Sequence, residues 1–209
     1  MTPTDLGTCA LSDALDALGL PGVLPGVRAL SGSARVAGRA VTVTLGPAGS
    51  APAGRHLCTA AVDAAGPGDV VVVAHPGGDA AGWGGILSLA AHRRGIEGVV
   101  IGGPARDVDE ARALGFAVFG TAATPVTARG RIAEIAWNEP IAIGPVLVAP
   151  GDLVVGDENG VVVVPATRRT EVLERAAAIV EREAAIAAAV RSGTPVAEAM
   201  GASYERMLS

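Results

Sequence analysis

The sequence predicts an α/β fold with parallel βαβ units and a C-terminal helical extension. Residues 55–120 alternate between helical and strand-like patterns in units short enough for βαβ crossovers, which are typical of a parallel sheet. Residues 130–165 hold several short strand-like runs separated by turns, and residues 166–209 have a helical pattern. We therefore expect a core domain over residues 1–165. The helices that follow it would either cover its sheet or pack on a neighbouring subunit.

The composition favours a compact globular protein. Of the 209 residues, 50% are hydrophobic and 18% are charged, so the chain can bury a core; at 2% aromatic residues, that core must consist of Val, Ala, Ile and Leu. A net charge of −5 without a basic cluster argues against nucleic acid as the main partner. No apolar run approaches the roughly 18 residues of a membrane span, and the N-terminus lacks a signal-peptide pattern. Cys9 and Cys58 are too few for a disulfide framework or a zinc site, so we expect a cytoplasmic protein without membrane contact.

The first part of the chain predicts two helices and two strands. A helix over residues 8–19 follows from apolar residues at spacings of three and four, with Gly19 as a plausible C-cap. Regularly placed valines predict a strand over residues 34–45. Residues 54–65 have a helical pattern, and residues 67–75 form a turn followed by a fully apolar strand.

The middle of the chain continues this alternation. A glycine-rich loop over residues 77–85 leads into a helix over residues 86–94, and its free N–H groups would form a nest for an anion. A strand over 98–101, a helix over 107–114 and a short strand over 116–119 follow.

The sequence pattern changes in the last part of the chain. Residues 157–160 (Asp-Glu-Asn-Gly) lie between two apolar runs and predict a hairpin, since Asn-Gly suits turns with positive φ. The triplet Pro-Gly-Asp precedes a strand at 67–72 and again at 150–155, which indicates the same turn chemistry used twice. A long helix is expected from residue 166 or 167 to about residue 191, with a shorter helix after it.

One absence narrows the possible chemistry. All 16 basic residues are arginines, so the chain contains no lysine. Schiff-base enzymes need a lysine amine, and the Walker-type phosphate loop also requires a lysine. If this protein stabilises a carbanion or an enolate, a metal ion or an arginine must offset the negative charge.

The strongest candidate site is the pair Arg106–Asp107. It follows an apolar strand and a Gly-Gly-Pro turn, at the edge of a parallel sheet where ligands usually bind. There the arginine could bind an anionic substrate while the carboxylate holds a divalent metal. The simpler interpretation is a surface pair in which Asp107 stabilises the start of the next helix.

Several segments resemble the RraA-like family, which includes the 4-hydroxy-4-methyl-2-oxoglutarate/4-carboxy-4-hydroxy-2-oxoadipate aldolases. They are SDALD in the first helix, PGDVVVV, the stretch from Gly82 to Pro125, and GDENGVVVVP near the end. The spacing Gly-x20-Arg-Asp-x2-Glu, from Gly85 to Glu110, is the most specific of these features. The resemblance implies an α/β/β/α sandwich of the swivelling β/β/α type, with residues 1–165 as the catalytic domain. It also implies homotrimers or hexamers with sites between subunits.

The resemblance implies a metal-dependent (class II) pyruvate aldolase. Arg106 would bind the carboxylate of the pyruvyl group and steady the enolate, and Asp107 would coordinate Mg²⁺ or Mn²⁺. The backbone at Gly85, Ile86 and Leu87 would complete the substrate site. Such a site fits the absence of lysine, because the metal lowers the energy of the enolate.

Three acidic residues are candidates for supporting roles. Where this chain has Gly85, well-established aldolases of the family carry an aspartate that holds metal-bound waters. Asp79 could replace that aspartate, or it is a solvated loop residue. Glu110 could orient Arg106, or form a surface pair with it at i, i+4 spacing. Glu183 matches an acidic position that reaches the metal site of a neighbouring subunit.

Two functions follow as hypotheses. The first is a lyase that acts on short 2-oxo dicarboxylates through a pyruvate enolate, by aldol cleavage, by oxaloacetate decarboxylation or by both. The second is a non-catalytic, protein-binding regulator that resembles the ribonuclease E inhibitor branch of the family. The intact pair of Arg106 and Asp107 favours the lyase, because a pure binder has no use for such a clamp.

Overall fold

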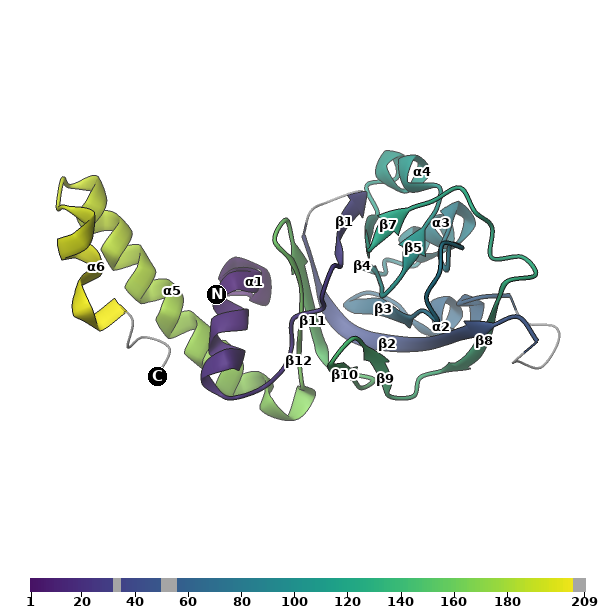
Figure 1. The fold of residues 1–209 in the computed structure, drawn as a ribbon, viewed down its shortest axis with the longest axis horizontal. Helices are drawn as coiled ribbons and strands as arrows, with labels where there is room; N and C mark the ends of the chain where they lie inside the picture. Colours follow the sequence, from purple (N-terminus) through teal and green to yellow (C-terminus); the bar gives the residue numbers. More distant parts are fainter. Residues whose placement is uncertain (32–34, 50–55, 205–209) are drawn as a thin grey trace.

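The computed structural model describes residues 1–31, 35–49 and 56–204. It is a mixed α/β fold in which one curled sheet carries helices on both sides, as Figure 1 shows. The strands of this main sheet are β1 (Arg28–Ser31), β2 (Val36–Pro47), β3 (Asp69–Ala74), β4 (Gly98–Ile101), β6 (Ala117–Gly120), β8 (Ile132–Trp137), β11 (Leu153–Asp157) and β12 (Gly160–Val164). Two small sheets pair β9 (Ile141–Ile143) with β10 (Val146–Val148) and β5 (Pro104–Ala105) with β7 (Ala122–Ala123).

The predicted βαβ units form the centre of the main sheet. Strands β2, β3, β4 and β6 are neighbours and run parallel, whereas β1, β8, β11 and β12 pair antiparallel. Helices α2 (Thr59–Ala64), α3 (Gly85–Arg93) and α4 (Val108–Ala113) each connect two successive parallel strands. The α/β prediction is therefore confirmed.

The valines of β3 explain why this strand lies between two layers. Successive side chains of a strand point to opposite faces. Val71 and Val73 pack in the apolar cluster shared with α2, α3 and α4, while Val70 and Val72 pack in a second cluster with β9, β10, β11 and β12. Since both faces are covered, the strand is apolar throughout, as buried parallel strands usually are.

Strands β11 and β12 separate this second cluster from a third one. Val154 and Val163 point inward, whereas Val155 and Val164 pack against helices α1 (Pro3–Ala17) and α5 (Arg169–Arg191). The curled main sheet thus supplies two sheet layers, one with β2, β3, β4 and β6 and one with β11 and β12. With helices outside each of them, the order of the layers is helix, sheet, sheet and helix, which is the expected α/β/β/α order.

The first helix begins earlier than predicted. Thr2, in front of Pro3, forms a capping box with Asp5 in the first turn, and these short-range bonds start the helix five residues before the apolar pattern does. Gly7 interrupts it with a φ of 76°, and the Asp157 carboxylate accepts the N–H of Thr8 (2.8 Å), where the helix resumes. The end is as predicted, because Gly19 has a φ of 65° and lies just after the helix.

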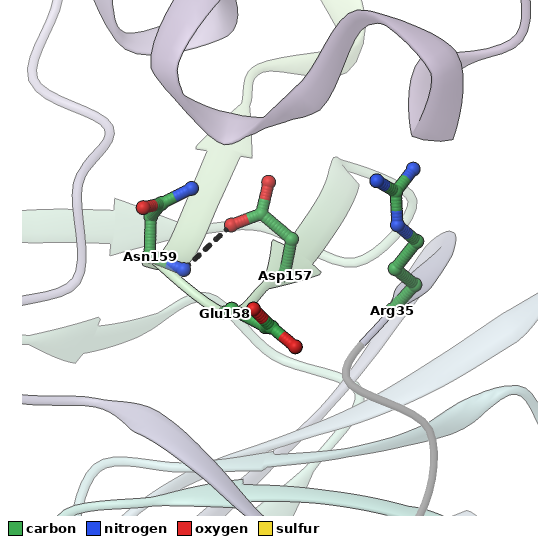
Figure 2. Close-up of a pocket in the computed structure, with 4 residues that line it drawn as sticks. All are labelled: Arg35, Asp157, Glu158 and Asn159. Atoms are coloured by element: carbon green, nitrogen blue, oxygen red, sulfur yellow. Dashed lines mark hydrogen bonds between the residues drawn. The ribbon is translucent and has the colours of Figure 1, made fainter.

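Asp157 belongs to the predicted hairpin between β11 and β12, which is confirmed. The turn itself differs from the expected type, since neither Glu158 nor Asn159 has a positive φ. The Asp157 carboxylate instead accepts the backbone N–H of Asn159 (2.8 Å), as Figure 2 shows. Burial raises the pKa of Asp157, but the hydrogen bonds from Thr8 and Asn159 lower it by more, so the net pKa lies below its usual value.

The repeated Pro-Gly-Asp triplet does build the same turn twice. Asp69 accepts the N–H of Gly66 (3.1 Å), and Asp152 accepts the N–H of Ala149 (2.8 Å), in each case from three residues earlier. Asp152 also accepts the N–H of Ala166 (2.8 Å) and so ties this turn to the start of the C-terminal helices.

The helix predicted over 54–65 is shorter. Helix α2 begins at Thr59, and Cys58 before it has a φ of 62°, so the helical backbone cannot continue back through that residue. Residues 54 and 55 of the predicted helix lie outside the described residues. Other predicted boundaries in the core agree within about two residues.

The C-terminal helices are η1 (Ala166–Arg168), α5 and α6 (Val196–Tyr204). Val172, Ala176 and Ile179 of α5 are buried against α1 and the sheet, whereas the second half of α5 is largely exposed. In Figure 1 this half and α6 project away from the core. Their packing on a neighbouring subunit stays a prediction. None of the described helices is long and apolar enough to cross a bilayer.

Candidate active site at the ends of three parallel segments

Three short chain segments end side by side next to the parallel sheet. Strands β5 and β7 pair in parallel, and Trp83 forms a parallel bridge with Ala105 of β5. The N–H of Arg106 donates to the carbonyl of Trp83 (2.9 Å), which aligns these two segments. Because all three run the same way, the residues that follow them meet at one edge, where ligands of α/β proteins usually bind.

Asp107 is held in an unusual backbone conformation at this edge. Its φ of 54° and ψ of 37° lie in the left-handed region, which few residues other than glycine adopt. It occupies the N-cap position of α4, yet its side chain makes no capping bond there. Its carboxylate instead accepts the N–H of Gly85 (3.0 Å), the first residue of α3. The backbone strain thus turns the carboxylate toward the neighbouring helix, an arrangement common at functional sites.

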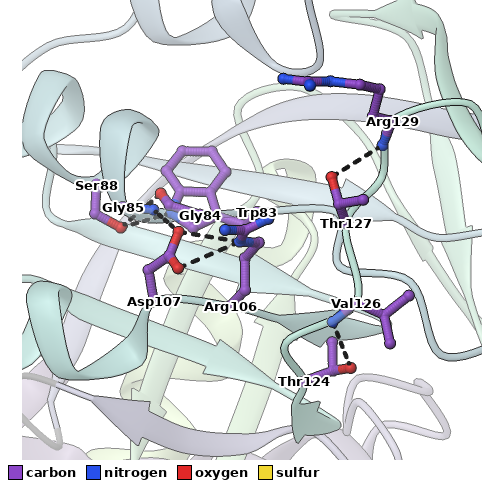
Figure 3. Close-up of polar contacts among 10 residues, drawn as sticks. All are labelled: Trp83, Gly84, Gly85, Ser88, Arg106, Asp107, Thr124, Val126, Thr127 and Arg129. Carbon is purple, nitrogen blue, oxygen red and sulfur yellow. Dashed lines mark hydrogen bonds and ion pairs between the residues drawn. The ribbon is translucent and has the colours of Figure 1, made fainter.

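Arg106 and Asp107 point together, as Figure 3 shows. Nε of Arg106 lies 3.2 Å from each oxygen of the Asp107 carboxylate. The side chains are 39% and 30% exposed, so water and small molecules can reach both. Within the described part of the chain, the two terminal nitrogens of Arg106 have no hydrogen-bond partner. They remain available for a planar anion such as a carboxylate.

The start of α3 adds two more donors. Among the described residues, the N–H groups of Ile86 and Leu87 have no acceptor, as expected in the first turn of a helix. The Ile86 side chain is 81% exposed beside them. Ser88 accepts the indole N–H of Trp83 (2.9 Å), and this bond fixes the buried ring beneath the helix start.

The anion nest expected from the glycine-rich loop is smaller than predicted. Gly77 donates its N–H to His75 (3.1 Å), Ala81 to the carbonyl of Val126 (2.9 Å), and Gly82 to the carbonyl of Pro104 (3.0 Å). These N–H groups shape the loop and are not available to a ligand. At the start of α3, the N–H groups of Ile86 and Leu87 remain without an acceptor among the described residues.

His75 anchors this loop. Its Nε2 lies 2.9 Å from the carbonyl of Ala80, while its Nδ1 accepts the N–H of Gly77. Burial lowers the pKa of His75, and the hydrogen bond to Ala80 only partly opposes this. The ring therefore favours the neutral form with its proton on Nε2.

Glu110 occupies the space beside Gly85. A Cβ atom at Gly85 would overlap the Glu110 carboxylate and would lie 3.2 Å from Cβ of Asp107. The two carboxylates are therefore close neighbours at the N-terminus of α3. Glu110 forms no hydrogen bond or ion pair with Arg106 within the described ranges, so neither role predicted for it through Arg106 is seen.

The other two acidic candidates make no hydrogen bond or ion pair with Arg106 or Asp107 within the described chain. Asp79 is exposed on the glycine-rich loop and has no hydrogen bond or ion pair in the part of the chain that is described. Glu183 is exposed on α5. In Figure 1 this helix lies across the main sheet from α3 and α4. Only a second copy of the chain could bring Glu183 to Arg106.

The donor chemistry fits a small divalent cation. No cluster of three or more His, Cys, Asp or Glu residues is found among residues 1–31, 35–49 and 56–204. Two carboxylates, Asp107 and Glu110, are nevertheless what Mg²⁺ typically uses, since it keeps several waters and takes one or two protein carboxylates. The pair of residues could thus hold such an ion with water or substrate completing its coordination.

Sequence reasoning missed the third segment of the site. The N–H of Thr124 donates to the carbonyl of Ala105 (2.9 Å), so the chain after β7 runs along the site. The strands that place it there have two residues each, which is too short for a recognisable alternating pattern.

Comparisons with known proteins agree with this fold and identify the family. The RraA-like family, described as Aldolase/RraA, matches residues 8–163. A Halalkalibacterium halodurans protein, whose name proposes a 4-hydroxy-4-methyl-2-oxoglutarate aldolase, is 37% identical over 81% of this chain and 77% of its own length. The solved structure of Streptomyces coelicolor RraAS2, described as an unusual member of the RNase ES inhibitor RraA protein family, has a TM-score of 0.77. It is 31% identical and covers 87% of this chain and 91% of its own.

One relative is much longer than this chain. Protein DlpA of Legionella pneumophila is 32% identical over 90% of this chain, but the chain spans only 31% of DlpA. The family match, in contrast, extends over most of this chain, from residue 8 to residue 163. The chain therefore belongs to the RraA-like family.

Proposed function

We propose that this protein is a divalent-metal-dependent lyase that acts on short 2-oxo dicarboxylates through a pyruvate enolate. The reaction would be aldol cleavage of the 4-hydroxy-4-methyl-2-oxoglutarate type, decarboxylation of oxaloacetate, or both. The observation that carries the proposal is the convergence of a partly free guanidinium, two free backbone N–H groups and two carboxylates at one edge.

Each group has a role in this reaction. The terminal nitrogens of Arg106 would bind the carboxylate of the pyruvyl group in a planar two-point contact, with Ile86 and Leu87 N–H groups assisting. Asp107 and Glu110 would hold Mg²⁺ or Mn²⁺. A bound divalent ion supplies Lewis-acid stabilisation of negative charge on the substrate. The Arg106 guanidinium would add positive charge next to the enolate oxygen of the substrate.

Both reactions share one intermediate. In aldol cleavage the bond between C3 and C4 breaks, its electron pair stays on C3, and the C4 hydroxyl loses its proton to become a carbonyl. In decarboxylation the same carbon keeps the electron pair as CO₂ leaves. Protonation of C3 then gives pyruvate in either case. Stabilising this enolate without lysine requires the cations that the site can provide.

We further propose that residues 1–165 form the catalytic domain and that the C-terminal helices pack on a neighbouring subunit of a cytoplasmic homotrimer or hexamer. The exposed second half of α5 supports this arrangement. In such an assembly Glu183 of another copy would approach the metal.

Metal removal tests the lyase. We expect EDTA treatment to abolish enzyme-dependent pyruvate release from oxaloacetate and from 4-hydroxy-4-methyl-2-oxoglutarate, and added Mg²⁺ or Mn²⁺ to restore it. A protein-free sample with the same metal corrects for the background reaction. If no metal-dependent turnover above that background is found, the proposed lyase activity is wrong. The protein-binding regulator, supported by the similarity to RraAS2, would then be preferred.

Glu110 provides a second test, because its carboxylate lies where the side chain of residue 85 would be. We expect Glu110→Ala to weaken Mg²⁺ or Mn²⁺ binding by about 10–100-fold, the range typical for residues that support a metal site. Titration calorimetry measures this, with Asp109→Ala on the same helix as the control. Adding Gly85→Asp to Glu110→Ala should recover affinity, since the new carboxylate enters the vacated space. If Glu110→Ala and Asp109→Ala bind the metal with equal affinity, Glu110 does not contribute to the metal site.

A further inference from the structure

The chain that follows β7 forms one wall of the candidate site. Thr124 is bonded to the carbonyl of Ala105, the residue immediately before Arg106, and the carbonyl of Val126 accepts the N–H of Ala81 (2.9 Å). The segment is thus attached both to β5 and to the glycine-rich loop. The residues that follow therefore start next to Ala81, close in sequence to Trp83, whose carbonyl accepts the N–H of Arg106 (2.9 Å).

Those next residues form an ordered turn from Thr127 to Arg131, here named the Arg129 turn. The N–H of Arg131 donates to the carbonyl of Ala128 (2.8 Å), and Gly130 has a φ of 72°, which glycine adopts without strain. Thr127 Oγ1 accepts the N–H of Arg129 (3.2 Å), and the Arg131 guanidinium donates to the carbonyl of Thr127 (3.2 Å). Arg131 is therefore used to shape the turn.

The Arg129 side chain has no such structural use. It is exposed, and its guanidinium has no hydrogen-bond or ion-pair partner in the described ranges. In Figure 3 it extends from the turn toward the side on which Trp83 and the start of α3 lie. A free cation on an ordered turn beside an anion site can select the charge of a ligand.

The charges around the site give a direction to this selection. No Asp or Glu occurs between Glu110 and Glu134, so the wall that contains the Arg129 turn carries only positive charge. In Figure 3 Asp107 lies on the other side of Arg106 from the Arg129 turn, and the protein groups there, Asp107 and Glu110, are acidic and offer no cation of their own to a second carboxylate. A dianionic ligand bound through one carboxylate at Arg106 would therefore place its other carboxylate toward the Arg129 turn.

We infer that Arg129 is a specificity-determining residue that binds the far carboxylate of a 2-oxo dicarboxylate, whose near carboxylate is bound at Arg106. The inference rests on the proposed function and adds to it a residue that binds the far carboxylate of the substrate. It explains a preference for dicarboxylates over monocarboxylates of equal chain length. The contact is solvent-exposed, so its effect should be modest and should shrink as the salt concentration rises.

Stable ligands allow a test that does not depend on turnover. Titration calorimetry of the metal-loaded protein would compare 2-oxoglutarate with 2-oxopentanoate, which has the same chain length but lacks the second carboxylate. We expect Arg129→Ala to reduce the preference for 2-oxoglutarate about fivefold at low salt, the usual upper value for an exposed ion pair. Arg129→Lys should keep most of the preference. The control Arg93→Ala, at the far end of α3, should keep it in full.

The same variants are then assayed for pyruvate release from 4-hydroxy-4-methyl-2-oxoglutarate and from 4-hydroxy-4-methyl-2-oxopentanoate. If Arg129→Ala loses its KM preference for the dicarboxylate substrate in parallel with its binding preference, both proposals are supported. Altered binding preference without turnover in the parent protein supports the Arg129 assignment and contradicts the lyase. An unchanged binding preference in Arg129→Ala, or a parent protein that binds neither ligand, overturns the assignment whatever the turnover.

Discussion

Replacing Asp107 with asparagine is expected to lower metal-dependent pyruvate release by about 10²–10³-fold, because several kcal/mol of Lewis-acid stabilisation depend on the metal it holds. Asparagine has the same shape, tolerates the left-handed backbone of this position and can still accept the N–H of Gly85. The substitution therefore removes the charge and little else. Initial rates over a range of Mg²⁺ or Mn²⁺ concentrations measure the effect.

Two further variants separate charge from backbone strain. Asp107→Gly removes the carboxylate and relaxes the φ of 54°, so it should fold at least as well as the parent protein but remain inactive. Asp109→Asn, two residues along the chain, should retain activity. Near-normal rates for Asp107→Asn at low metal concentration would mean that Asp107 does not hold the metal.

Arg106→Lys should have a comparable effect. The lysine keeps the positive charge, but its ammonium cannot reproduce the planar two-point contact that the terminal nitrogens of arginine make with a carboxylate. It also loses the Nε donor that contacts both oxygens of Asp107 at 3.2 Å. We expect kcat/KM to fall by about 10²–10³-fold, the range seen when a single donor to a developing oxyanion is removed.

The kinetic pattern of Arg106→Lys is informative in itself. Since Arg106 would bind the substrate and also stabilise the enolate, KM should rise and kcat should fall together. Arg93→Lys, an exposed arginine on α3 without a described contact, is the matched control. If Arg106→Lys keeps most of the parent kcat/KM, the arginine does not bind the pyruvyl carboxylate.

The local pattern of the chain was sufficient to predict much of the fold. The four consecutive valines of β3 predicted a fully apolar strand, and both of its faces are indeed covered. The helical spacing in α1 and the glycine at its end were also read correctly. These features depend on neighbouring residues, because strand alternation and helix periodicity are local properties of the backbone.

Errors arose where a distant contact or a single backbone angle decided the structure. The start of α2 was placed too early, since nothing in the sequence signals that Cys58 has a positive φ. The hairpin turn was assigned the wrong geometry, because the Asp157 carboxylate bonds to Asn159 and to Thr8 in a helix from the other end of the chain.

At the candidate site, the residue types and the strand edge followed from sequence, as did the exclusion of lysine chemistry. The positions of Glu110 beside Gly85 and of the chain after β7 beside Ala105 came only from the folded chain. The physical reason is that a motif specifies which groups are present. Their relative directions depend instead on strained backbone angles and on hydrogen bonds between segments far apart in the sequence.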